Sequence, residues 1–329
     1  MKVIIPLAGF GTRLRPHTFT KPKPLMNVAG KPVLGHLLDK IAGMDIEEYI
    51  FIVGYLGDQV EEYVKKEYKL NARFVEQKDL LGQAHAIWLA RESLDEGPVF
   101  ILFVDTLFEA DLSTLGKTDA DAVIFVKEVE DPRPFGVVTL DKDENITGFV
   151  EKPAVMDNRL AVVGLYYFKN GMALINAIQE LMDLKKMTKN EYFLADAMDI
   201  MVKSGCIFRT APVSVWLDCG KPDTVLETNR WLLENGRDNT AKVVHGDDVL
   251  IVGPVNIHPS AKLSQSVIGP HVTIGANSSV TGCVLRDTII DEGATCKDTL
   301  LEQSLIGRNA RVEGRFRTVN VGDSSAVGF

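Results

Sequence analysis

The spacing of hydrophobic residues changes near residue 240, and this change constrains the fold more than any other feature. Before it, short apolar runs of strand length alternate with amphipathic segments whose apolar residues fall at helical intervals. This alternation predicts an α/β fold with a mostly parallel sheet and helices on both faces. The expected strands are residues 3–7, 48–53, 72–76, 99–104 and 122–126, and the expected helices are residues 34–43, 57–67, 82–93, 172–184 and 192–204.

Beyond residue 250, apolar residues recur five or six positions apart, with glycine, asparagine and small residues between them. This spacing is typical of hexapeptide repeats, and it predicts a parallel β-helix of about four coils rather than a loop-rich β-sandwich. We therefore expect two domains, residues 1–240 and 241–329, linked by a helix over residues 227–239. The expected interior positions are Ile251, Ile257, Leu263, Ile268, Ile274, Val280, Leu285, Ile290, Cys296, Leu301, Ile306 and Val312.

The overall charge limits the partners that the chain can bind. Its formal net charge of −9 argues against broad binding to nucleic acid or to an anionic membrane, but it leaves room for a local basic pocket. No apolar stretch approaches the length of a membrane span, and the N-terminus lacks the layout of a signal peptide. The four cysteines show no closely spaced pair, so we expect no structural zinc site or disulfide framework, and a cytoplasmic location.

A glycine-containing loop follows the first expected strand and indicates a nucleotide site. Gly9 and Gly11 allow the backbone to approach a ligand closely, and the exposed N–H groups of such a loop can bind an anion. Arg13 and Lys23 add fixed positive charge, which suits a polyphosphate. The loop is not a dinucleotide fingerprint, because Leu14 stands where a third glycine is needed, and it is not a P-loop. The simpler alternative is an ordinary strand-to-helix turn with solvated arginines.

The loop resembles the signature of the sugar-1-phosphate nucleotidylyltransferases, which ends in Gly-Thr-Arg-Leu and continues to Lys-Pro-Leu. Further segments resemble motifs of that family in the same order. The resemblance is greatest to the longer glucose-1-phosphate thymidylyltransferases and then to the uridylyltransferases, and it covers residues 1–235 and the repeats. It implies a Rossmann-like catalytic domain followed by a left-handed β-helix. The matching segments are residues 77–86, 135–138, 150–153, 164–166 and 216–220.

The implied reaction is the attack of a sugar-1-phosphate oxygen on the α-phosphorus of a nucleoside triphosphate, which releases pyrophosphate. The protein must align the reactants and supply positive charge. Asp105 and Asp218 each follow an apolar run, and two such carboxylates can hold Mg²⁺. The resemblance makes these two aspartates the metal-binding pair, although an isolated aspartate at a strand end is often only a cap or turn residue.

The resemblance also assigns substrate-binding residues. Arg13 matches the arginine that serves pyrophosphate, and Lys23 matches the lysine that serves the reacting phosphates. Lys152 and Glu151 match groups that bind the sugar phosphate and sugar hydroxyls, although a surface ion pair is the alternative for them. The full nucleotide-binding set is Leu7, Ala8, Gly9, Gly11, Thr12, Arg13, Gln77 and Gly82, and the sugar-phosphate set is Gly136, Glu151, Lys152 and Gly164.

The sequence specifies the nucleobase of the substrate less narrowly than the phosphate-binding and sugar-binding residues. The amide of Gln77 offers a donor and an acceptor, which can match the edge of uracil or thymine, and Gly82 lets the base lie against backbone. These two bases differ by a methyl group that the amide does not contact, so the use of both UTP and dTTP is expected. His85 is placed near the base by resemblance. Two residues depart from the family pattern, since Phe10 and Val104 stand where glycine is usual.

Other functions remain open. A mannose-1-phosphate guanylyltransferase shares the expected fold and repeats, and a non-catalytic regulatory paralogue that senses nucleotides belongs to a different class. Retention of Arg13, Lys23, Asp105, Lys152 and Asp218 favours catalysis. Acyl transfer by His271 is disfavoured because the repeat region is short. The partners we expect are a nucleoside triphosphate, a sugar-1-phosphate and further copies of the chain, which would assemble through the β-helix into a homo-oligomer.

Overall fold

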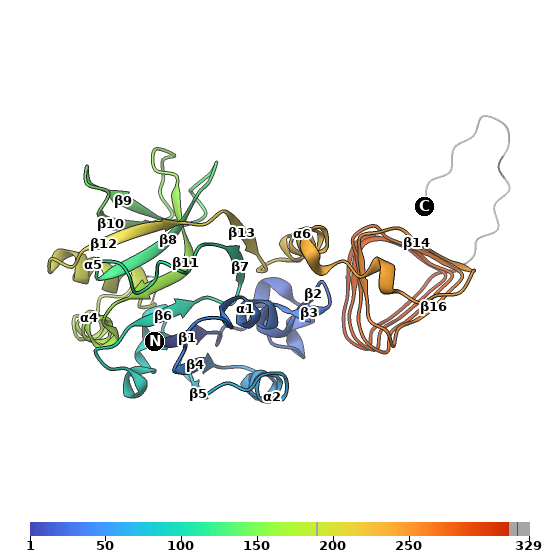
Figure 1. Ribbon diagram of the computed structural model, residues 1–329, viewed down its shortest axis with the longest axis horizontal. Helices are drawn as coiled ribbons and strands as arrows, with labels where there is room; N and C mark the ends of the chain where they lie inside the picture. The colour runs from blue at the N-terminus through green and yellow to red at the C-terminus, as the bar shows by residue number, and fades with distance from the viewer. Residues whose placement is uncertain (189, 316–320, 322–329) are drawn as a thin grey trace. The chain divides into compact units, whose positions relative to one another are not determined.

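The computed structural model describes residues 1–188, 190–315 and 321 (Figure 1). The chain forms two compact units. The first contains Met1–Met26 and Pro32–Lys221, and the second contains Asn27–Lys31 and Pro222–Phe329. Within the described ranges, no helix is both long enough and apolar enough to cross a bilayer.

The first unit is built on a sheet of nine strands whose central part is parallel. Strand β1 (Lys2–Pro6) lies between β4 (Glu48–Val53) and β6 (Val99–Leu102), and β5 (Ala72–Glu76) extends the sheet beyond β4. All three pairings are parallel, as the alternation of apolar runs and helices predicts. The carboxyl ends of these strands therefore meet at one edge of the sheet.

Antiparallel strands complete this sheet. The long strand β11 (Leu160–Phe168) pairs antiparallel with β6, β8 (Ala122–Glu128) and β9 (Gly136–Leu140). Strand β10 (Ile146–Glu151) pairs with β9, and β12 (Phe208–Pro212) runs parallel to β8. The mostly parallel α/β prediction is confirmed for the centre of the unit, and the antiparallel strands add a second half that the periodicity did not reveal.

Two short strands form a separate ribbon beside the sheet. Strand β7 (Thr106–Glu109) pairs antiparallel with β13 (Val215–Asp218). The expected strand over residues 99–104 is thus too long, because β6 ends at Leu102 and the chain turns into β7. At this turn the N–H of Phe103 donates to the carbonyl of Gly164 at 3.0 Å, where β11 also changes register.

Helices cover both faces of the sheet. Ile4, Ile50 and Ile101 pack with apolar residues of α3, α4 and α5 in one core cluster. Val3 and Phe51, which alternate with them and point to the opposite face, are also fully buried. The helices are α1 (Val33–Ile41), α2 (Gly57–Glu67), α3 (Gln83–Trp88), α4 (Gly171–Asp183) and α5 (Leu194–Lys203), with short 3₁₀ turns at Thr12–Leu14, His17–Phe19, Lys23–Leu25 and Arg91–Ser93.

The second unit begins with α6 (Pro222–Leu232), which continues into a π-helical turn at Leu233–Arg237, and a 3₁₀ turn follows at Thr240–Lys242. The expected linking helix over residues 227–239 is therefore placed too late in the chain. The side chain of Asn229 is fully buried, and its Oδ1 accepts from Thr273 Oγ1 at 2.7 Å while its Nδ2 donates to the His271 carbonyl at 3.2 Å. These bonds hold α6 to the strands of its own unit.

The remaining strands of the second unit stack in parallel ladders, consistent with the expected β-helix (Figure 1). Partners across the ladders lie 16 or 17 residues apart, as for Arg286 with Glu302 and Ser264 with Thr281. Every expected interior position from Ile251 to Val312 belongs to one buried apolar cluster or, when only partly buried, packs against it. The strands are β14 (Val249–Ile251), β15 (Val255–Ile257), β16 (Lys262–Ser264), β17 (Ser266–Ile268), β18 (Val272–Ile274), β19 (Ser279–Thr281), β20 (Val284–Ile290), β21 (Thr295–Lys297), β22 (Leu300–Ile306) and β23 (Arg311–Glu313), with a two-stranded sheet of β2 (Asn27–Val28) and β3 (Lys31–Pro32).

Candidate active site

The glycine loop leaves the sheet where β1 ends and is held in a strained turn at Gly11. Gly11 has a φ of +61°, and a Cβ atom there would lie 3.1 Å from the Cβ of Lys23. Thr18 Oγ1 donates to the Gly11 carbonyl at 2.8 Å, which fixes the turn from the other side. Glycine is therefore required at this position both for its backbone conformation and for the close approach of Lys23.

A cavity of about 370 Å³ lies at the carboxyl ends of the parallel strands in the first unit. It brings together every residue of the predicted nucleotide set and three of the four predicted catalytic residues, Arg13, Lys23 and Asp105. Val104 also lines it, as expected for a position next to Asp105. The lining residues are Pro6, Leu7, Ala8, Gly9, Gly11, Thr12, Arg13, Lys23, Pro24, Gln77, Leu80, Gly82, Gln83, Ala86, Phe103, Val104, Asp105 and Glu191.

The β7–β13 ribbon brings the two predicted metal-binding aspartates to neighbouring positions. Asp218 lies opposite Thr106, and the N–H of Cys219 donates to the Asp105 carbonyl at 2.8 Å. Lys23 Nζ lies 3.0 Å from Asp105 Oδ2, so a cation already accompanies this carboxylate.

Gly220 completes the turn behind Asp218. Its N–H donates to Asp218 Oδ1 at 2.9 Å. A Cβ atom on Gly220 would lie 2.8 Å from that oxygen and 3.2 Å from Arg13 Nη2, so the absence of a side chain lets the glycine loop reach the second aspartate. In the described ranges, no group of three or more histidines, cysteines or carboxylates forms a ready-made metal site. The two aspartates fit a metal that takes its other ligands from substrate phosphates, as Mg²⁺ does.

The end of the cavity that holds Gln77 is shaped by α3 and the loop before it. Gly82 has a φ of +104°, and a Cβ atom there would lie 2.6 Å from the Tyr192 carbonyl oxygen, which explains the glycine. The Gln77 amide nitrogen donates to the Gly82 carbonyl at 3.2 Å and contacts His85 Nδ1 at 3.1 Å. His85, which the resemblance only placed near the base, is therefore in direct contact with Gln77.

The predicted sugar-phosphate residues lie on β9, β10 and β11. Gly136 and Glu151 face each other across the β9–β10 pair, and Lys152 follows with a φ of +50°. Glu151 and Lys152 are exposed and do not line the 370 Å³ cavity. Gly164 packs against Phe103, and a Cβ atom there would lie 3.3 Å from the Phe103 Cβ.

Tyr166 connects the sugar-phosphate residues to the aspartates. Burial, and then the nearby charges of Glu151 and Asp105, raise the pKa of its hydroxyl. The ring of Phe135 lies 4.8 Å from that of Trp216, on the strand that ends in Asp218. The two predicted sets therefore belong to neighbouring parts of one surface. Phe135, Tyr166 and Trp216 lie in segments that resemble family motifs, but no periodic signal in the sequence marked these contacts.

Phe10 projects away from the cavity. Its side chain is 48% exposed, and its ring lies 5.8 Å from the ring of Tyr55. Tyr55 in turn donates its hydroxyl to the Phe19 carbonyl at 2.8 Å. The bulky residue that replaces the usual glycine therefore packs against the β4–α2 connection. No sequence pattern indicated that Tyr55 would be its partner.

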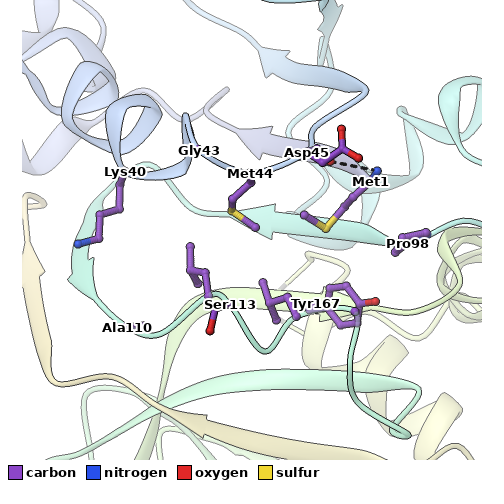
Figure 2. Close-up of a pocket in the computed structure, with 12 residues that line it drawn as sticks. Met1, Lys40, Gly43, Met44, Asp45, Pro98, Ala110, Ser113 and Tyr167 are labelled. Carbon is purple, nitrogen blue, oxygen red and sulfur yellow. Dashed lines mark hydrogen bonds between the residues drawn. The ribbon is translucent and has the colours of Figure 1, made fainter.

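A second cavity of about 570 Å³ in the first unit holds none of the predicted site residues (Figure 2). Met1, Met44 and Tyr167 line it, and the N-terminal amino group donates to the Asp45 carbonyl at 3.4 Å. Its lining includes Lys40, whose ammonium group pairs with the carboxylate of Glu109. The cavity at the glycine loop offers Arg13 in addition to Lys23, together with the backbone N–H groups of the loop, so it suits a polyphosphate better than this larger cavity.

Comparison with known proteins agrees with this geometry. The family model described as "Nucleotidyl transferase" matches residues 2–235, and the model described as "GMPPB C-terminal domain" matches residues 251–328. A glucose-1-phosphate thymidylyltransferase of Streptomyces antibioticus is 31% identical, with 99% of each chain covered. The catalytic subunit beta of a mannose-1-phosphate guanylyltransferase of Xenopus tropicalis is also 31% identical, with 98% of this chain and 90% of the relative covered. A crystal structure of a UDP-glucose pyrophosphorylase with UDP-glucose shares the fold, with a TM-score of 0.64 and 23% identity over 71% of this chain and 98% of the other.

Proposed function

The chain belongs to the nucleotidyl transferase family as a sugar-1-phosphate nucleotidylyltransferase, and on that premise we propose that it transfers a nucleotidyl group from UTP or dTTP to glucose-1-phosphate in a Mg²⁺-dependent reaction. One observation carries this proposal. The glycine loop, Lys23 and Asp105 line one cavity, and Asp218 lies beside Asp105 on the paired ribbon. This arrangement suits a triphosphate whose α-phosphorus is turned toward the two aspartates.

Arg13 and Lys23 act on the phosphates. The guanidinium of Arg13 presents a planar fork of donors for the departing pyrophosphate, and the ammonium of Lys23 offsets charge on the reacting phosphoryl group. The oxygen of glucose-1-phosphate attacks the α-phosphorus while the bond from that phosphorus to the bridging oxygen of the β-phosphate breaks. The products are a nucleoside diphosphate glucose and pyrophosphate, and no protein nucleophile takes part.

Asp105 and Asp218 would hold Mg²⁺, because carboxylate oxygens are its preferred protein ligands and phosphate oxygens complete its coordination. When bound, the ion would supply positive charge to the phosphoryl group in transfer. Glu151 and Lys152 would hold the sugar phosphate, with Gly136 and Gly164 giving room beside them. We expect a chelator to abolish turnover and added Mg²⁺ to restore it.

We further propose that residues 1–240 are the catalytic domain and that residues 241–329 form a left-handed β-helix. The β-helix would join copies of the chain into a homo-oligomer, because stacked coils leave flat faces and ends that tend to be covered. A cytoplasmic location fits four free cysteines. A light-scattering comparison of the full chain with residues 1–245 tests the assembly role, since an unchanged oligomer size would contradict it.

A second candidate is the transfer of a guanylyl group to mannose-1-phosphate. The match of residues 251–328 to the GMPPB C-terminal domain and the similarity to a mannose-1-phosphate guanylyltransferase favour it. Pyrophosphate release from a matrix of sugar-1-phosphates and nucleoside triphosphates separates the two. We expect the fastest release with glucose-1-phosphate and UTP or dTTP. Release only with mannose-1-phosphate and GTP would favour the second candidate, and no release with any pair would favour a regulatory paralogue.

A further inference from the structure

The two hydrogen atoms on the Gln77 amide nitrogen are both used within the protein. The nitrogen donates to the Gly82 carbonyl at 3.2 Å, and its other neighbour is His85 Nδ1 at 3.1 Å. A primary amide nitrogen carries two donors and no acceptor, so these contacts occupy it fully. Gln77 is only 6% exposed, yet it lines the cavity. Across the described ranges, its Oε1 accepts no hydrogen bond from protein.

We propose that His85 fixes the orientation of the Gln77 amide, so that the base site offers an acceptor and selects a nucleobase with a ring N–H. This inference rests on the proposed function and identifies a residue that positions the base-reading group. Uracil and thymine carry such an N–H at N3, and guanine carries one at N1. Cytosine and adenine present an unprotonated ring nitrogen at the corresponding place, which would face Oε1 as a second acceptor.

The contacts of His85 determine which ring nitrogen carries the proton. The Gly82 carbonyl only accepts, so the Gln77 atom that faces it is the amide nitrogen, and the same nitrogen faces His85 Nδ1. Because an amide nitrogen only donates, Nδ1 accepts and the ring proton lies on Nε2. The Asp79 backbone raises the pKa of the ring, the direction expected when a carbonyl faces a ring N–H. Rotating the Gln77 amide by half a turn would place its oxygen against two acceptors, Nδ1 and the Gly82 carbonyl. The protein therefore opposes the reversed orientation.

The ring is also held in place and kept neutral. It stacks on Trp88 with ring centroids 6.3 Å apart, and Trp88 Nε1 donates to Gln179 Oε1 at 2.8 Å. Burial is the largest influence on the ring and lowers its pKa, while the charge of Asp79 raises it and the charge of Arg91 lowers it. The neutral form therefore dominates at neutral pH, and the ring gains a proton as the pH falls below the usual histidine range.

Protonation should weaken the selection of a ring N–H. A protonated His85 carries a proton on Nδ1 and can no longer accept from the Gln77 amide, which then keeps only the Gly82 carbonyl to hold its nitrogen away from the base. The affinity for UTP should therefore fall relative to that for CTP as the pH drops through the His85 titration. This response distinguishes a positioning role from a purely structural one.

The test measures dissociation constants of UTP and CTP by calorimetry with the full chain, at about pH 8 and about pH 5.5. We expect His85→Leu to reduce the UTP preference at least about tenfold at the higher pH, because the Gly82 carbonyl alone then orients the Gln77 amide. His85→Asn keeps an oxygen acceptor that does not titrate, so it should keep the preference and lose its pH dependence. His258→Asn, at an exposed histidine of the second unit, is the control for general effects of the substitution.

If His85→Leu keeps the UTP preference of the wild type, the inference is overturned. If His85→Leu does not fold, His85→Asn decides instead, and an unchanged pH dependence in that variant would overturn the inference. A wild-type protein that binds CTP or ATP best would also overturn it, whereas a preference for GTP would support it. Pyrophosphate release is measured separately. A protein that binds UTP through His85 but releases no pyrophosphate would contradict the proposed function alone.

Discussion

The two units of the chain depend on contacts of very different range. In the second unit, ladder partners such as Ser264 and Thr281 lie 17 residues apart, and a spacing of 16 or 17 residues recurs along the stacked strands. In the first unit, the Lys23–Asp105 ion pair joins residues 82 apart, and the bond from Trp216 to Thr106 joins residues 110 apart. Repeated local contacts therefore form the interior of the second unit, whereas contacts between distant residues bring together the candidate active site of the first unit. Function should be sensitive to point changes in the first unit, and stability to changes in the second.

The largest expected effect is the loss of turnover in Asp105→Asn. An amide at this place cannot neutralise Mg²⁺ or Lys23, so we expect kcat/KM to fall at least about 100-fold. Stability should change little, because the Asp105 side chain is 39% exposed. Pyrophosphate release and thermal unfolding measure the two effects. Asp119→Asn, at an exposed carboxylate away from the cavity, should retain full activity, and a fully active Asp105→Asn would remove the metal assignment.

The reverse pattern is expected in the second unit. Leu285 is fully buried in its apolar cluster, so Leu285→Ala should lower the free energy of unfolding of this unit by about 2–5 kcal/mol. Leu300 is 79% exposed on a neighbouring strand, so Leu300→Ala should change it by less than about 0.5 kcal/mol. Urea unfolding measures both. Activity per folded molecule should stay near that of the wild type, and a large loss of kcat in Leu285→Ala would contradict the separation of the two units.

The same contrast explains how much could be predicted from the sequence. The whole apolar series from Ile251 to Val312 was predictable because the same local spacing repeats along this part of the chain. Strands β4 and β5 and helix α2 were also predicted with their observed bounds, because each has an unambiguous period and clear ends.

The missed features are all made by distant partners. Strand β6 ends early because Phe103 bonds to Gly164, and the β7–β13 ribbon exists only through pairing across the chain. The family resemblance supplied the residues of the site. It did not reveal that His85 contacts the Gln77 amide nitrogen or that the ring of Phe10 packs against that of Tyr55. Periodicity reports which face of an element is buried and carries no information about which distant segment will cover it.

A smaller effect is expected from Gly11→Ala in the glycine loop. The added Cβ atom would press on Lys23 in a backbone conformation that favours glycine, so we expect kcat/KM to fall about tenfold as Lys23 shifts. Gly205 also has a positive φ, of +96°, but a Cβ atom there would meet nothing within 4 Å. Gly205→Ala therefore controls for backbone strain alone. Equal activity losses in the two variants would show that the contact with Lys23 has no part in the effect.

The smallest effect concerns the cysteines. The rate at which their thiols are labelled measures how often each unit opens, and it does so without a change in the interior of the second unit. Burial raises the pKa of the Cys296 thiol to about 11 and also raises that of Cys283, so little thiolate forms at either position near pH 8. Cys206 in the first unit is only partly buried. We expect a disulfide reagent to label Cys206 first, and Cys206→Ser to remove that fast phase.

Cys219 of the first unit is also buried, so it is replaced by serine as well, and the slow phase that remains should then measure how often the second unit opens. Leu285→Ala should accelerate the labelling of Cys283 and Cys296, because a weakened interior exposes these thiols more often. Asp105→Asn should leave those rates unchanged, because its carboxylate belongs to the first unit. If Asp105→Asn accelerated the labelling of Cys283 and Cys296 as much as Leu285→Ala does, the two units would unfold together. The two units would then differ in the range of their contacts but not in their independent stability.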